Sequence, residues 1–274
     1  MSLRDKDQPG LSAPAAGASA PKRPALVACL GASATASIGS YDWIKDLEQR
    51  PETSAMRFVR FAEGGDLAYN GLARLPAIIE SRPDDVIVLL GENDAMALVS
   101  KTFYRFARLT KRLPQKPSPA WFGETMKTIV RRLKRDTSAR IALCSLIPVG
   151  EAPTSTDSMQ AGLNRQIETY SLMIKEIAAA EGVSYLPLYE RLQALILASP
   201  GRAFTSFNFL PFYRDVFRQF VLHQDHDEIG RRNGWKFHRD GIHLNSASGK
   251  IMADLVEEFI RAGANAKSLD VMRP

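Results

Sequence analysis

The stretch DVIVLLGEND, residues 85–94, decides the fold that this chain is expected to adopt. Five apolar residues follow Asp85 without interruption, a pattern that is typical of a parallel strand buried on both faces. The run ends in the polar turn Gly91-Glu92-Asn93-Asp94. Ligands of open parallel sheets bind beyond the carboxyl ends of the strands, so this turn is the first place to look for a functional site.

Strand signals alternate with helical signals along the rest of the chain. Further buried-strand runs lie at residues 25–30, 56–61, 140–147 and 183–188. Helical patterns are expected at residues 41–49, 67–80, 121–135, 159–180, 189–198 and 246–262. Five strand-then-helix repeats predict a doubly wound α/β fold, with a mainly parallel five-stranded sheet and helices on both faces.

The sequence also predicts the local role of two aspartates and the conformation of one basic stretch. Asp66 stands directly before the helix at 67–80 and is expected to cap it. Asp94 is expected to cap a turn or helix rather than to act as a catalytic acid. The 25 or so residues after Asp94 are basic and are expected to be irregular up to the helix at 121–135.

We expect one domain over residues 25–265, with insertions at about 96–120 and 199–239 near its active-site edge and a tail at 266–274. Residues 1–24 contain four prolines among Ala, Gly and Ser and lack the apolar core of a signal peptide. They predict a disordered leader and an intracellular, cytoplasmic protein. No stretch approaches the 18 apolar residues of a transmembrane helix.

The two cysteines, Cys29 and Cys144, each lie inside an apolar run. They are expected to be buried, reduced thiols rather than a disulfide or a zinc site. The stretch His223-Gln224-Asp225-His226-Asp227 has residue types that bind metals, but on a charged segment a solvated helix end is the favoured interpretation. We therefore predict neither a metal nor any other cofactor.

The net charge of +6 is concentrated in one segment. Residues 96–140 contain 12 Lys and Arg against 2 Asp and Glu, while the remainder of the chain is slightly acidic. A solvated loop over the active site is the favoured interpretation. Aromatic residues between the cations leave nucleic-acid binding as an alternative, and steering of an anionic substrate or membrane surface is a third.

The second insertion is rich in aromatic residues, from Phe204 to Tyr213 and on to Phe217 and Phe220. Aromatic side chains at helical spacing are most often part of a core. A lid that lines an acyl-chain pocket and a dimer interface are the alternatives.

Near the C-terminus, Asp240 and His243 stand three residues apart. An Asp and a His on one turn can hydrogen-bond, which orients the imidazole as in a Ser-His-Asp triad. On its own the pair favours the plainer interpretation, in which Asp240 caps a helix that begins near Ser246 and His243 is an ordinary histidine.

The turns after the first three predicted strands supply the missing parts of such a triad. Ser33 follows Gly31-Ala32, where a strand-to-helix turn can expose its hydroxyl and point its N–H at a developing oxyanion. Gly65 can present a second backbone N–H, and the Asn93 side chain a third donor. His243 would then accept the Ser33 proton while Asp240 holds His243.

These four blocks resemble the SGNH (GDSL-type) hydrolases. The matching residues are Gly31-Ala32-Ser33, Gly65, Gly91-Glu92-Asn93-Asp94 and Asp240-Gly241-Ile242-His243, and the likeness runs from about residue 25 to 262. The resemblance implies a flavodoxin-like three-layer sandwich and a serine esterase acting through an acyl-serine. It implies Ser33 as nucleophile, His243 and Asp240 as base and orienting acid, and an oxyanion hole from Ser33, Gly65 and Asn93.

The chain departs from the family pattern in two blocks. Ala32 replaces an Asp that is normally structural, so catalysis is expected to survive. Gly64 could take the place of Gly65 in the second block, but Gly65 is preferred because Asp66 follows it.

The expected partner is a small-molecule or lipid-like acyl ester, and nucleic acid is not favoured. An acyltransferase with the same triad is an alternative. A non-catalytic module that binds anionic polymer through residues 96–140 is another. The sequence does not set the acyl chain, the alcohol or the oligomeric state.

Overall fold

The computed structural model describes residues 23–207 and 225–271. The predicted leader lies almost wholly outside these residues, as does the larger part of the aromatic stretch in the second insertion. Five strands form one sheet in the order β2-β1-β3-β4-β5, and every neighbouring pair is parallel. The strands are β1 Leu26–Gly31, β2 Arg57–Ala62, β3 Asp85–Leu89, β4 Arg140–Cys144 and β5 Ser184–Leu186.

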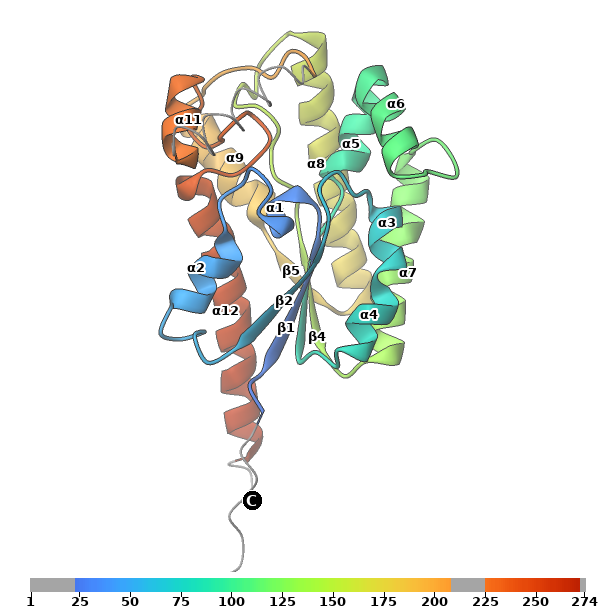
Figure 1. The fold of residues 1–274 in the computed structure, drawn as a ribbon, viewed down its shortest axis with the longest axis vertical. Helices are drawn as coiled ribbons and strands as arrows, with labels where there is room; N and C mark the ends of the chain where they lie inside the picture. Colours follow the sequence, from blue (N-terminus) through green and yellow to red (C-terminus); the bar gives the residue numbers. More distant parts are fainter. Residues whose placement is uncertain (1–22, 208–224, 272–274) are drawn as a thin grey trace, which may run out of the picture.

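Helices cover both faces of this sheet (Figure 1). They are α1 Ser33–Ala36, α2 Trp43–Gln49, α3 Ala68–Ala73, α4 Leu75–Glu80, α5 Glu92–Val99, α6 Lys101–Thr110, α7 Pro119–Asp136, α8 Ser158–Glu181, α9 Leu188–Ala198, α11 His226–Arg232 and α12 Ser246–Val271. The predicted doubly wound α/β class is confirmed. Helix α12 continues through most of the predicted tail.

Alternate side chains of the central strands enter two separate cores. Leu30 of β1 points to the core formed with α3, α4, α5, α7 and α8, where Phe122 and Tyr170 meet edge to face. Cys29 points to the opposite core, formed with α2, α9 and α12. This period of two is what a strand buried on both faces requires.

Both cysteines are buried and free, as predicted. Burial raises the pKa of the Cys29 and Cys144 thiols above its ordinary value, so both stay protonated. They contribute to the second core as small apolar side chains.

The predicted irregular stretch after Asp94 is wrong, because the structure has α5 and α6 there. The Ser100 hydroxyl accepts a hydrogen bond from the Phe103 N–H at 3.2 Å and caps α6. Phe103 and Ala107, one turn apart, are its buried residues. Because only two residues of α6 are buried and many of the others are exposed cations, the sequence shows no clear helical pattern of apolar residues here.

The predicted cap at Asp66 is also wrong. The N-terminus of α3 is instead bound by Asp94, whose Oδ2 accepts from the Ala68 N–H at 3.0 Å. Asp66 is buried and pairs with Arg74 and Lys111. Its two cations follow it in the sequence, Arg74 eight positions later and Lys111 in the basic segment, so neither is part of a local capping pattern.

The register of the first three strands aligns their ends. Gly31 at the end of β1 lies opposite Ala62 of β2 and Leu89 of β3. The turns that follow these three strands therefore leave the sheet at the same edge, and α1 lies at that edge in Figure 1.

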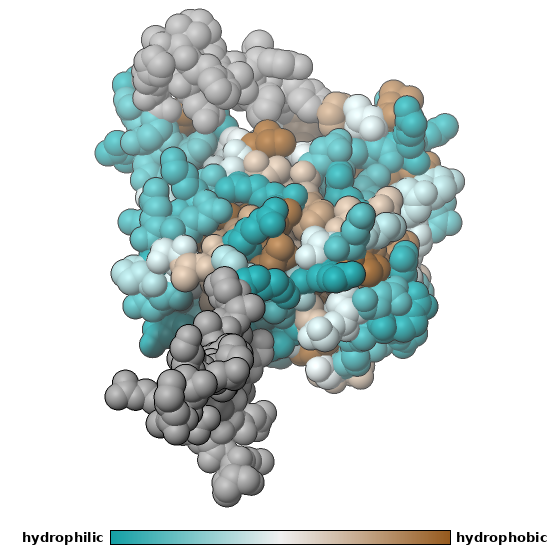
Figure 2. Space-filling model, turned by 60° about the horizontal axis from the view of Figure 1, so that its bottom comes forward, coloured by the Kyte–Doolittle hydropathy of each residue, from teal (hydrophilic) through white to brown (hydrophobic). Residues whose placement is uncertain are grey.

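Among the described residues, no helix is long and apolar enough to cross a membrane. Figure 2 turns the lower end of the molecule towards the reader. Hydrophilic side chains cover most of the described part of that face, with apolar patches between them.

Candidate active site

Ser33 begins α1 directly beyond β1. The turn requires Gly31, because a Cβ there would lie 2.0 Å from the Thr35 hydroxyl oxygen and 3.1 Å from the Leu89 carbonyl oxygen. The N-cap of α1 is Ala32, so Ser33 does not serve as a cap. Its Oγ lies 3.0 Å from Nε2 of His243.

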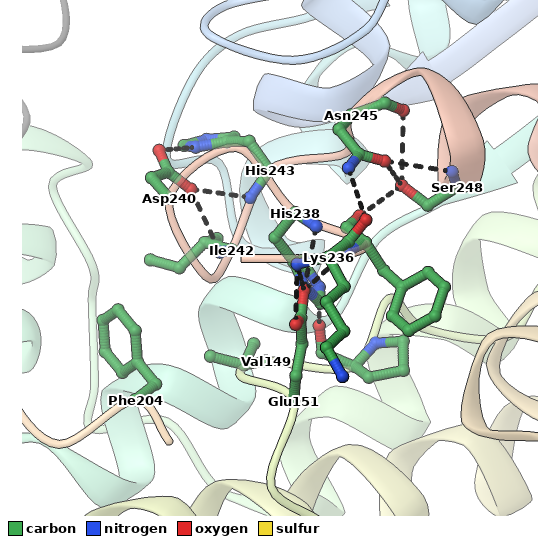
Figure 3. A network of polar contacts seen from close by, with 12 residues as sticks. Val149, Glu151, Phe204, Lys236, His238, Asp240, Ile242, His243, Asn245 and Ser248 are labelled. Atoms are coloured by element: carbon green, nitrogen blue, oxygen red, sulfur yellow. Dashed lines mark hydrogen bonds and ion pairs between the residues drawn. The ribbon is translucent and has the colours of Figure 1, made fainter. Parts of the chain in front are cut away.

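His243 is held on its other side by Asp240. Asp240 Oδ2 lies 2.7 Å from His243 Nδ1, and Oδ1 accepts from the N–H groups of Ile242 and His243 at 3.0 and 2.9 Å (Figure 3). Burial raises the pKa of Asp240. Attraction to His243 and these hydrogen bonds lower it by more, so the pKa lies well below its usual range.

The alternative role of Asp240 as a helix cap does not occur. At the start of α12, Asn245 Oδ1 accepts from the Ser248 N–H at 3.2 Å. Asp227 Oδ1 accepts from the Ser246 N–H at 2.7 Å. Asp240 instead bonds the backbone of its own turn and the ring of His243.

The partners of the imidazole fix its tautomer. An ionised Asp240 can only accept, so it places the ring proton on Nδ1. The Nε2 lone pair then faces the Ser33 hydroxyl. This arrangement can take a proton from the hydroxyl while the carboxylate stabilises the charge that forms on the ring.

The turn after β2 lies beside Ser33. Gly65 has a φ of +78°, which favours glycine. A Cβ at Gly64 would lie 4.0 Å from the Ser33 Cβ, so this turn is adjacent to the serine. The choice of Gly65 over Gly64 as the donor stays a prediction.

Four charged residues hold this turn. Lys111 Nζ lies 2.7 Å from Glu63 and 2.9 Å from Asp66, and Arg74 bonds the same two carboxylates. The Lys111 side chain is nearly buried, and a Cβ on Gly65 would meet its Cε at 3.2 Å. Sequence reasoning missed Lys111, because it appeared as one cation among many in the basic segment.

Asn93 connects the turn after β3 to the turn after β2. It is 5% exposed, and its Nδ2 donates to the Asp66 carbonyl oxygen at 2.8 Å. A primary amide carries two N–H donors, so one remains for another acceptor. Asn93 lines the same cavity as Ser33 and His243.

This cavity is small. Its volume is about 20 Å³, which is room for about one water molecule. The side chains around it, besides those already described, are Ala32, Ala34, Leu89, Glu92, Met96, Ile147 and Ile242. The buried Glu92 accepts from the Ile147 N–H at 3.1 Å, and burial raises the pKa of its carboxyl group.

In residues 23–207 and 225–271, no three or more His, Cys, Asp or Glu side chains gather where they could hold a metal ion. Asp225 of the stretch with metal-binding residue types caps α11, accepting from the Glu228 N–H at 2.7 Å. His223 and Gln224 lie outside the described residues.

Most cations of residues 96–140 form ion pairs. Arg131 and Lys134 reach Glu181 on α8, and Arg140 reaches Asp85 on β3. These pairs neutralise much of the local charge, and they weaken the case for this segment as a nucleic-acid surface.

A Ser-His-Asp chain of contacts thus lies at the carboxyl edge of a parallel α/β sheet, an arrangement that is typical of hydrolases with a serine nucleophile. The model of the GDSL-like lipase/acylhydrolase family matches residues 29–248. The chain belongs to this family, and it is therefore a hydrolase acting on ester bonds. A comparison with curated proteins finds no match.

Solved structures of similar fold include a lipase/acylhydrolase from Enterococcus faecalis, 17% identical, with a TM-score of 0.55 over 87% of this chain and 96% of the other. The acetyl xylan esterase AlAXEase is 17% identical, with a TM-score of 0.56 over 86% and 99%. A catalytic mutant of an acetylxylan esterase from Geobacillus stearothermophilus is 13% identical, with a TM-score of 0.55 over 85% and 92%.

The raised pKa of the buried Asp94 predicts that the stability of the fold depends on pH. Burial raises its pKa from 3.8 to about 7, so the folded state favours the protonated form. This contribution to stability is complete below the unfolded pKa and is lost as pH rises towards 7. We expect Asp94→Asn to flatten the fall in the free energy of unfolding between pH 5 and 7, measured by urea denaturation.

Asp46→Asn is the matched control. Burial raises the pKa of Asp46, but hydrogen bonds from Arg50 and Tyr41 lower it by more, so it is ionised throughout this range. The control should therefore lower stability without changing the slope. An unchanged slope in Asp94→Asn would contradict the assignment.

Proposed function

We propose that this hydrolase cleaves short acyl esters through an acyl-serine formed on Ser33, with His243 as the general base and Asp240 as the residue that orients it. One observation carries the proposal. Two contacts, of 3.0 and 2.7 Å, join a serine and an Asp-His pair across 210 positions of sequence. Both ring nitrogens of His243 are engaged, one by a hydroxyl and the other by a carboxylate, as the proton transfers of a Ser-His-Asp triad require.

The reaction balances with these three side chains and water. Ser33 Oγ attacks the ester carbonyl carbon while His243 Nε2 accepts the hydroxyl proton. The tetrahedral intermediate collapses as His243 returns the proton to the leaving alcohol oxygen and the carbon–oxygen bond breaks. Water, activated in the same way, then attacks the acyl-serine and releases the acid and free Ser33.

The oxyanion of the intermediate is held by the N–H groups of Ser33 and Gly65 and by the Asn93 side chain. Each such donor is worth about 2.7–4 kcal/mol in the transition state. Support comes from the position of all three at the ends of β1, β2 and β3, on the edge where Ser33 lies. The second N–H of Asn93 supplies the third bond.

The size of the cavity supports a short acyl group. A volume of about 20 Å³ beside Ser33 has room for a group of about the size of a methyl. Two of the solved structures that share this fold are described as acetyl xylan esterases. An acetyl ester is accordingly the substrate class that we propose.

Ser33→Ala should abolish hydrolysis of p-nitrophenyl acetate and labelling by a fluorophosphonate, with little change in melting temperature. The hydroxyl contacts His243 and does not cap α1, so its loss removes the nucleophile and little else. Ser54→Ala, which alters an exposed serine, is the control and should retain both. Substantial activity in Ser33→Ala would exclude it as the nucleophile.

Asn93→Ala should reduce kcat by about 10²–10³ with little change in KM, because it removes a donor to the oxyanion. Asn70→Ala is the matched control. Its side chain also bridges two segments, accepting from Leu67 and donating to Lys111, but it does not line the cavity. Equal losses in the two variants would show that Asn93 acts only through the scaffold.

Acyl chain length gives the test of substrate class. Overfilling a packed site costs about 1–3 kcal/mol, which is about 5- to 160-fold in kcat/KM. We expect kcat/KM for p-nitrophenyl acetate to exceed kcat/KM for the octanoate ester by at least about fivefold. Met96→Ala, which enlarges the cavity, should narrow the difference. A wild-type preference for octanoate would refute the short-acyl proposal.

A further inference from the structure

The loop between β4 and α8 contains a carboxylate with no exposure to solvent. Glu151 is 0% exposed. It accepts from three consecutive backbone N–H groups, those of Lys236 at 2.9 Å, Phe237 at 2.7 Å and His238 at 3.0 Å. The side chain of His238 adds a fourth contact, with Nδ1 at 2.9 Å (Figure 3).

The partners of His238 define its charge. Its Nε2 lies 2.8 Å from the Pro148 carbonyl oxygen, and a carbonyl can only accept. Burial raises the pKa of Glu151, but His238 and the backbone N–H groups lower it by more. The ionised Glu151 also only accepts. Both ring nitrogens therefore carry protons, and His238 is a buried imidazolium paired with a carboxylate.

This pair is joined directly to the Asp240–His243 turn. His238 forms an antiparallel bridge with Leu244, and the Arg239 N–H donates to the His243 carbonyl oxygen at 2.9 Å. The Gly150 N–H donates to the Gly241 carbonyl oxygen at 2.7 Å. One loop, residues 148–151, thus binds the turn at two places, at His238 before Asp240 and at Gly241 after it.

The start of the second insertion is bound to the same residue. The Gly201 N–H donates to the Glu151 carbonyl oxygen at 2.7 Å, and the Glu151 N–H donates to the Arg202 carbonyl oxygen at 2.8 Å. A Cβ on Gly201 would lie 2.2 Å from Glu151 Oε2. Glu151 therefore binds two parts of the chain. Its backbone bonds Gly201 and Arg202, and its carboxylate bonds residues 236–238, just before the Asp240 turn.

We propose that Glu151 and the His238 imidazolium form a positioning pair that sets the Asp240–His243 turn against Ser33. This role rests on the proposed function of those three residues. Neither member of the pair touches the Ser33 cavity, so both act through the turn. A misplacement of about 1 Å in a reacting group can cost about 10²-fold in rate, which makes a rigid support for the base consequential.

A carboxylate is required here because four donors converge on it. A glutamine has one acceptor oxygen, and its NH2 group would face an N–H donor instead of accepting from it. Glu151→Gln is therefore nearly isosteric but disrupts the support. We expect kcat for p-nitrophenyl acetate to fall roughly 10- to 100-fold with KM unchanged, and fluorophosphonate labelling of Ser33 to slow in parallel.

The matched control is Asp85→Asn. Asp85 is a nearly buried carboxylate at the amino end of β3, bonded to Arg140 at 2.7 Å, far along the strand from the catalytic edge. It should reduce the melting temperature and leave kcat within about twofold of wild type. A similar fall of kcat in both variants, or none in Glu151→Gln, would overturn the positioning role.

Two further measurements keep the proposal testable if Glu151→Gln does not fold. His238→Gln keeps the backbone contacts of Glu151 and should lower kcat in the same direction by a smaller factor. In the wild-type protein, ¹⁵N NMR of His238 should show both ring nitrogens protonated at neutral pH. A neutral ring, or full kcat in His238→Gln, would refute the imidazolium pair.

Ser33→Ala, measured in the same assay, separates this proposal from the one on which it rests. An active Ser33→Ala would mean that the nucleophile is wrongly assigned. An inactive Ser33→Ala together with a fully active Glu151→Gln would leave the nucleophile in place and reject the positioning pair alone.

Discussion

The contact between Ser33 Oγ and His243 Nε2, at 3.0 Å, is the constraint on which the rest of the site depends. It requires the first strand and the last turn of the sheet domain to end at one place. The parallel register brings Ser33 to the edge, since Gly31 is level with the ends of β2 and β3. The last turn has no strand to place it, so loop contacts must do so.

Four carboxylates near this edge, three of them buried, behave differently because their partners differ. Asp240 and Glu151 are surrounded by donors, which lower the pKa of each and keep them ionised. Asp94 and Glu92 each receive fewer bonds, and burial raises their pKa. Among these four carboxylates, charge is thus retained only where the group contacts a histidine.

The sequence predicted the five strands, the helices on both faces and the clustering of Ser33, Asn93 and the Asp240–His243 pair, because each depends on a local pattern or on strand order. It could not predict Glu151, whose partners lie 85 to 87 positions away. The same holds for the Asp66 ion pairs. A cap at Asp94 was predicted, but not that the helix it caps would be α3. These depend on side chains that meet only after the sheet has formed.

Anchoring the second insertion on Glu151 has a consequence for how the site is built. The chain enters the segment at Gly201 and Arg202 and leaves it at Lys236 to His238, and both parts bind one residue. One buried residue therefore ties Gly201 and Arg202 to the segment that leads into the Asp240 turn. The same residue also contacts His238, whose neighbour Arg239 bonds the backbone of His243, so the start of the second insertion and the turn that holds the base share one support.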